Sequence, residues 1–156
     1  MVRAGDRAAT GRRATGRRWV EGRRVGGRHG TARVVLENAT RAVVLADHLV
    51  VARGFWARGV GLLGRASLDG GEGLLLAPCG SIHMLGMRFA IDALFLDGPG
   101  RAQLPGQGRC LAVCRGLAPG RFGPLVRGAR CVIELPAGAA GPTQPGDGLR
   151  WWGAGG

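Results

Sequence analysis

The feature that most constrains this chain is a series of short apolar segments separated by glycine, proline, asparagine or aspartate. These segments comprise residues 33–37, 42–46, 73–77, 91–96, 109–115, 130–135 and 149–152. Runs of about four to eight apolar residues between such turn signals are typical of β-strands, and a series of them is typical of a sandwich or a barrel. We therefore expect a mainly β fold, a single small β-barrel or β-sandwich of about six to eight short strands.

One segment departs from this pattern and predicts a short helix. The apolar residues 49–52 lead into a stretch with the spacing of one helix face, formed by Phe55, Trp56, Val60, Leu62 and Leu63. Glycines in this stretch each cost about 1 kcal/mol relative to alanine in a helix. We therefore expect the helix to depend on docking against the strands.

The basic residues divide the chain into unequal parts. The formal net charge is +12, and all 22 basic residues are arginine. Residues 1–33 hold ten arginines and two acids, and residues 1–32 show no apolar periodicity. We expect a disordered arm over 1–32, a folded domain over 33–152 and a disordered tail over 153–156. The arm is either a tether for nucleic acid or an acidic partner, or an unselected extension from a start codon placed too far upstream.

No stretch approaches the roughly 18 apolar residues that a membrane span requires. The N-terminal arginines are also not followed by the apolar run of a secretory signal. We expect no membrane insertion and a cytoplasmic location. In that compartment, the four thiols of Cys79, Cys110, Cys114 and Cys131 would be reduced.

Residues 78–92 gather five kinds of reactive side chain within one short stretch. These are the thiol, hydroxyl, imidazole, guanidinium and carboxylate of Cys79, Ser81, His83, Arg88 and Asp92. A convergence of such groups beside a core strand is what a small binding pocket requires. The same stretch also carries a family resemblance.

The folded part resembles the family known as domain of unknown function 192. The resemblance rests on ordered motifs: GLLGR at 61–65, EGLLL at 72–76, the block from Cys79 to Asp97, VIELPAG at 132–138 and GDGL at 146–149. Met84 and Ala90 stand where the family usually has threonine and proline. The resemblance implies a small, mainly β domain with a short helix, and it assigns no activity.

Nucleophilic catalysis is one chemical interpretation of residues 79–92. Cys79 and His83 would form a thiolate–imidazolium pair, and Asp92 would orient the imidazole ring. In an extended segment, however, the α-carbons of Cys79 and His83 lie roughly 13 Å apart, too far for a hydrogen bond without a bend. The alternative is a buried thiol, a histidine bonded to backbone and an ion pair between Arg88 and Asp92.

Ligand binding is the second interpretation, in which Ser81, His83, Arg88 and Arg65 surround an anionic group. A metal site would need Cys79, His83, Cys110 and Cys114, but Cys110 and Cys114 lack the C-x2-C spacing of structural zinc sites. We therefore expect no metal and no cofactor.

Two further positions have specific expectations. Glu134 lies within an apolar strand, and we expect it to face solvent or an arginine. Of Trp151 and Trp152, one should face the core and the other outward, because successive side chains on a strand alternate. An exposed tryptophan would either pack across a barrel end or mark a partner surface.

The leading hypothesis is a non-enzymatic accessory module that binds an unknown small ligand or protein partner near residues 79–92. One alternative is a small enzyme that uses Cys79 and His83. A second alternative is binding of nucleic acid or an acidic partner through the arm. The absence of a complete catalytic constellation favours the binding module over the enzyme.

Overall fold

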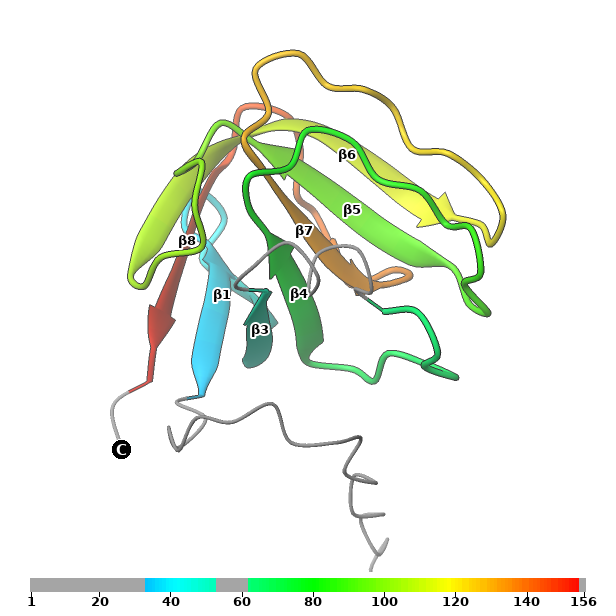
Figure 1. Cartoon of the computed structure of the whole chain (residues 1–156). Coiled ribbons are helices and arrows are strands. Elements are labelled where there is room, and N and C mark those ends of the chain that lie inside the picture. The colour runs from blue at the N-terminus through cyan, green and yellow to red at the C-terminus, as the bar shows by residue number, and fades with distance from the viewer. Residues whose placement is uncertain (1–32, 53–61, 155–156) are drawn as a thin grey trace, which may run out of the picture.

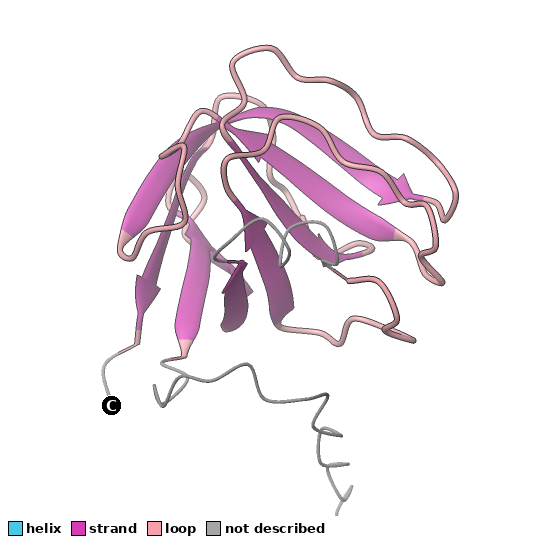
Figure 2. Cartoon of the chain, viewed as in Figure 1, coloured by secondary structure: helices cyan, strands magenta, loops and turns pink. Residues whose placement is uncertain are grey.

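The computed structural model describes residues 33–52 and 62–154, and these residues form strands, turns and loops (Figures 1 and 2). The strands are β1 (Val34–Asn38), β2 (Val43–Ala46), β3 (His48–Ala52), β4 (Glu72–Leu76), β5 (Ile91–Leu96), β6 (Gly106–Leu117), β7 (Cys131–Pro136) and β8 (Gly148–Gly153). The predicted mainly β class is confirmed. Within these two ranges, no helix is long and apolar enough to cross a membrane.

The eight strands form one mixed sheet in the order β2-β1-β8-β6-β5-β7-β4-β3. All neighbours are antiparallel except β3 and β4, which are parallel. The strand β6 lies between β8 and β5 and pairs with each along a different part of its length. Gly106–Arg109 pair with β8, and residues from Cys110 onward pair with β5. The pairing shows one open sheet, so the predicted closure into a barrel or a sandwich is not confirmed.

The predicted short helix is not observed. The apolar residues 49–52, which were expected to lead into the helix, belong to β3, and β3 pairs in parallel with β4 from His48–Glu72 to Ala52–Leu76. The remainder of the prediction falls mostly on 53–61, outside the described residues, and Leu62 and Leu63 after it are not helical. Apolar residues in a run as short as 49–52 fit a strand as well as a helix, and pairing with β4 favours the strand.

The sheet buries apolar side chains on both faces. All eight strands contribute to a first core, which includes Leu36, Leu94, Ile133 and Trp151. A second core lies on the other face of β4, β5 and β7, where Leu74, Phe95 and Val132 pack against Ile82 and Met84. The segment between β4 and β5 therefore covers one face of the sheet, and this segment contains the reactive residues noted in the sequence.

Candidate functional site

The segment 77–90, between β4 and β5, lies beside the segment 118–130, between β6 and β7 (Figure 1). Five backbone hydrogen bonds of 2.7–3.0 Å join the two segments: Cys79 N to Arg130 O, Val126 N to Gly80 O, Gly123 N to Ile82 O, Met84 N to Arg121 O and Gly120 N to Met84 O. His83 and Phe122 also form an isolated antiparallel bridge. These bonds fix the backbone of both loops without a regular strand.

Side chains along 81–84 alternate between the two sides of the loop. Ile82 and Met84 are buried in the second core, whereas Ser81 and His83 are exposed. A turn follows, closed by a hydrogen bond of 3.1 Å from the backbone N–H of Met87 to the carbonyl oxygen of Met84. Gly86 adopts φ +78° in this turn, a conformation that favours glycine. Because Ile82 and Met84 anchor the loop in the core, the polar side chains of Ser81 and His83 face outward.

Among the described contacts, Cys79 and His83 are not paired in the way that the nucleophile interpretation requires. The Cys79 Sγ atom lies 3.1 Å from the carbonyl oxygen of Ser81, and the thiol is half-buried. The exposed His83 ring instead meets Phe122 edge-on, with ring centroids 6.4 Å apart. Within the described residues, no hydrogen bond joins the Cys79 thiol to the His83 imidazole.

Asp92 is buried, and its hydrogen bonds are to backbone groups. Its carboxylate accepts hydrogen bonds from the backbone N–H groups of Gly116 (2.8 Å), Gly138 (2.9 Å) and Ala140 (3.0 Å). It lies on the opposite face of β5 from Ile91 and Ala93, which belong to the second core under the loop. The orientation of the His83 ring by Asp92 and an ion pair between Arg88 and Asp92 are therefore both absent from the described contacts.

The predicted ligand-binding residues divide into two places. Ser81, His83 and Arg88 are all exposed on the segment 77–90. Arg65 instead pairs with Glu72, with 2.6 Å between its Nη2 atom and the carboxylate oxygen. Three of the four predicted ligand-binding residues therefore lie exposed on one loop. The fourth, Arg65, forms an ion pair with Glu72 at the start of β4.

Glu134 was predicted to face solvent or an arginine, and that prediction is wrong. Its side chain is only 6% exposed, lies on the second-core face of β7 and has no hydrogen bond or ion pair among the described residues. Its direct neighbours are Leu74 on β4 and Ala93 on β5. Burial raises the pKa of the Glu134 carboxyl to about 7. The available signal for burial was the continuous apolar run on either side of Glu134, which is typical of a strand covered on both faces.

None of the four cysteines, all of which lie among the described residues, forms a disulfide. Cys110 and Cys131 lie in the first core, whereas Cys114 packs against the second core on the other face. Burial raises the pKa of the Cys110 thiol to about 11 and that of Cys131 to about 12. Across residues 33–52 and 62–154, no group of three or more His, Cys, Asp or Glu side chains is placed to hold a metal ion.

Exposed apolar and cationic side chains share the two joined loops. We call this set the loop surface: Leu85, Arg88, Arg121, Phe122, Leu125 and Arg127. Phe122 is 72% exposed and Leu125 is 84% exposed, which is unusual for large apolar side chains. Segments 78–90 and 118–130 contain no acidic residue. Sequence reasoning identified Arg88 but missed the contribution of 118–130, since only the fold brings the two segments together.

Comparison with known proteins places the fold in a family. The model of domain of unknown function 192, described as an uncharacterized ACR family, matches residues 33–151. The chain belongs to this family. The resemblance found in the sequence is thereby confirmed, and the family has no assigned function. None of the curated proteins matches the chain significantly.

Two solved structures share the fold. A protein of unknown function from Novosphingobium aromaticivorans has a TM-score of 0.59 and 21% identity, covering 75% of this chain and 82% of that one. A protein from Sinorhizobium meliloti described as a putative transcription regulator has a TM-score of 0.53 and 21% identity, covering 78% of this chain and 92% of that one. At this identity the similarity is one of fold.

Proposed function

We propose that this domain is a non-enzymatic binding module that captures an acidic protein segment through the loop surface. The observation that carries the proposal is the gathering of unpaired cations on the two joined loops. Arg88, Arg121 and Arg127 are exposed, and none of them has an ion pair among the described residues. Arginine binds carboxylates through two parallel hydrogen bonds, so these side chains suit aspartate and glutamate on a partner.

The apolar members of the loop surface suit a protein rather than a small anion. Phe122 and Leu125 expose most of their side chains beside these arginines. Aromatic residues and arginine are enriched at the centres of protein interfaces, where an apolar group excludes water from the charged contacts. The partner segment should therefore carry an apolar side chain among its acids.

The backbone bonds between the loops support the proposal on energetic grounds. Binding costs free energy when it orders mobile loops, and the five hydrogen bonds between 77–90 and 118–130 reduce that cost.

Selection from a random dodecapeptide library displayed on phage, with the full chain immobilised, tests the proposal. We expect enriched peptides to be rich in aspartate and glutamate around an apolar residue. Synthetic versions of these peptides should bind the Arg121→Ala/Arg127→Ala variant about 10- to 100-fold more weakly, because hydrogen bonds to charged groups contribute roughly 1.5–3 kcal/mol each.

Two further variants complete the experiment. Phe122→Ser should also weaken peptide binding, whereas Val50→Ser, which removes another exposed apolar side chain (58% exposed) on β3, should not. All variants should melt within a few degrees of the parent, since the altered side chains are exposed. Selection without acidic enrichment, or acidic peptides that bind every variant equally, would refute the loop surface as the docking site.

A further inference from the structure

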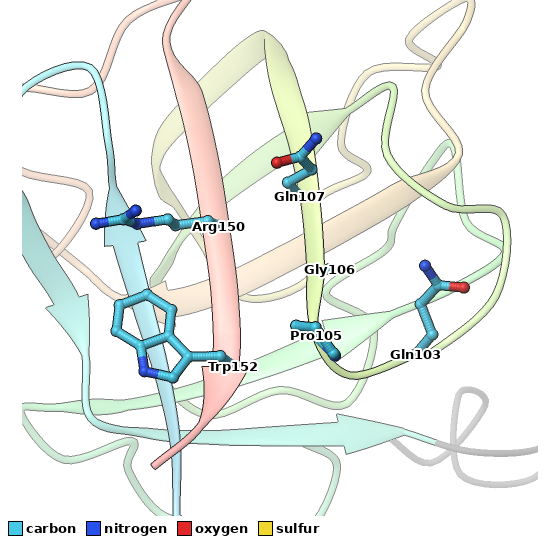
Figure 3. A pocket seen from close by; sticks show the side chains of 6 residues that line it. All are labelled: Gln103, Pro105, Gly106, Gln107, Arg150 and Trp152. Atoms are coloured by element: carbon cyan, nitrogen blue, oxygen red, sulfur yellow. The ribbon is translucent and has the colours of Figure 1, made fainter. Parts of the chain in front are cut away.

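A second site, which is lined by none of the six loop-surface residues, lies between β6 and β8. A pocket of about 550 Å³ is lined by Gln103, Pro105, Gly106, Gln107, Arg150 and Trp152. Figure 3 shows Arg150 and Trp152 extending from β8, with Gln107 on β6 and Gln103 on the loop before it. A Cβ atom on Gly106 would lie 2.5 Å from the indole of Trp151, so glycine is required for β6 to lie over that buried ring. The pocket is thus formed by β6, β8 and the loop that precedes β6.

The aromatic wall and the cation of this pocket are held in place. The Arg150 guanidinium lies 5.3 Å from the ring centroid of Trp152, within the range of a cation–π contact. The same guanidinium pairs with Glu37 on β1 at 2.8 Å. Trp152 is half-buried, as the alternation of Trp151 and Trp152 predicted. A planar ligand would therefore find a pre-oriented aromatic and guanidinium surface.

The two carboxamides specify the kind of planar ligand. Each of Gln103 and Gln107 presents one hydrogen-bond acceptor and two donors. The Gln103 amide oxygen accepts one hydrogen bond from Arg101 at 3.2 Å, which leaves its amide donors to the pocket. A nucleobase has both a face that stacks on tryptophan or arginine and an edge that pairs with carboxamides. A purely apolar ligand would leave both amides unsatisfied.

A second hollow of about 710 Å³ adjoins the pocket and shares Gln107 and Arg150 with it. This hollow adds the exposed side chains of Arg109 and Arg130, neither of which has an ion pair among the described residues. Its one acid, Asp97, accepts the backbone N–H of Arg109 at 2.6 Å. Cations therefore outnumber acids along the hollow, as phosphate binding requires.

We propose that the pocket and the hollow form one groove that binds single-stranded nucleic acid. A base lies against Trp152 and Arg150 and bonds to the glutamine amides, and the neighbouring phosphates lie at Arg109 and Arg130. Only an unpaired strand presents base faces for stacking, so a duplex does not suit the pocket.

Fluorescence anisotropy of the full chain with fluorescein-labelled 12-nucleotide dT and rU oligomers tests this proposal. We expect binding that weakens strongly between 50 and 200 mM NaCl. Trp152→Leu should weaken it roughly 5- to 100-fold, the usual effect of losing one stacked base, and Trp152→Phe should retain most of it. Arg109→Ala/Arg130→Ala should weaken binding and make the plot of log Kd against log [NaCl] shallower by about 1.

The matched control removes the same charge elsewhere. Arg121→Ala/Arg127→Ala, on the loop surface, should change oligomer affinity by less than twofold. An equal loss of oligomer affinity in this variant would mean that net charge alone attracts the oligonucleotide. Unchanged oligomer affinity in both groove variants would mean that the N-terminal arginines bind it instead. Each of these two results would overturn the proposal. So would the absence of any binding, or an equal affinity for a duplex of the same length. Peptide binding is measured separately, so the two proposals fail independently.

Discussion

Replacement of Glu134 by glutamine should remove most of the pH dependence of stability that this carboxyl causes. The raised pKa means that the folded state holds the proton between about pH 4.5, the ordinary value, and about pH 7, where the unfolded chain has lost it. Glu134 therefore costs no stability below about pH 4.5, costs progressively more between about pH 4.5 and about pH 7, and costs a constant amount above that range. The difference between the two pKa values corresponds to about 3 kcal/mol.

The neighbouring groups do not obscure this effect. Leu74 and Ala93 flank Glu134 without charge. Two titratable groups lie near it on that face: Glu72, two positions before Leu74 on β4 and paired with Arg65, and the Cys114 thiol, across Ala93. Burial raises the pKa of the Cys114 thiol above its ordinary value near 9, so it stays neutral in this range. The pH dependence that differs between parent and Glu134→Gln thus belongs to the carboxyl.

Urea denaturation at pH 5 and pH 8.5 measures the difference. We expect Glu134→Gln to be more stable than the parent at pH 8.5 by about 3 kcal/mol, or roughly 10 °C in Tm for a domain of this size. At pH 5 the two should differ little. Asp69→Asn, which removes an exposed carboxylate, should leave the parent's pH dependence intact. Parallel pH profiles for the parent and Glu134→Gln would refute the assignment of a buried, protonated carboxyl.

Three other outcomes follow from buried contacts. Asp92→Asn should lower the free energy of unfolding by about 2 kcal/mol, measured in urea, because an amide accepts the backbone N–H bonds less strongly than a carboxylate. Gly106→Ala should cost about 1–3 kcal/mol in the same assay, since its methyl group overlaps Trp151; an unchanged midpoint would contradict that contact. Native Cys110 and Cys131 should resist iodoacetamide at pH 8 and react in urea, because burial raises both pKa values, as peptide mapping would show.

Local pattern predicted most strands, and the misses have identifiable physical causes. The segment 91–96 coincides with β5, and 130–135 differs from β7 by one residue at each end. The strand β6 was predicted too short because Gly106 and Gly108 at its start look like turn residues. There the glycines allow close approach, since a Cβ on Gly108 would lie 2.8 Å from the backbone of Gly98. A glycine in a strand can thus indicate contact as well as a break.

The candidate site was less accessible to sequence reasoning, because its contacts are distant along the chain. Asp92 is bonded by backbone groups 24, 46 and 48 positions away, so its proximity to Arg88 in sequence was misleading. Glu134 resembles the solvent-facing residue of a half-buried strand. It is buried because β7 lies between β4 and β5 and loops cover its second face. Ser81 and His83 face outward because Ile82 and Met84, which alternate with them, pack into the second core. Sequence spacing predicted that Ser81 and His83 share a side, but not which side faces solvent.

The distribution of arginines connects the two proposed surfaces. Four described arginines pair with acids: Arg33 with Asp47, Arg41 with Asp147, Arg65 with Glu72 and Arg150 with Glu37. Arginine is the basic residue at all 22 basic positions of the chain, so a general preference for arginine would scatter the unpaired ones over the domain. Those without an acid partner in the described chain fall instead mainly on the loop surface (Arg88, Arg121, Arg127) and in the groove (Arg109, Arg130).

Charge alone cannot separate the ligands of these two surfaces, because carboxylates and phosphates are both attracted to arginine. Their uncharged neighbours provide the distinction. Phe122 and Leu125 offer no hydrogen bonds and favour an apolar side chain, whereas Trp152 with Gln103 and Gln107 favours a flat ring with polar edges. Phe122→Ser should therefore affect acidic peptides alone and Trp152→Leu oligonucleotides alone. If either variant lost both peptide binding and oligonucleotide binding, the arginines would act through a shared positive potential rather than as two separate sites.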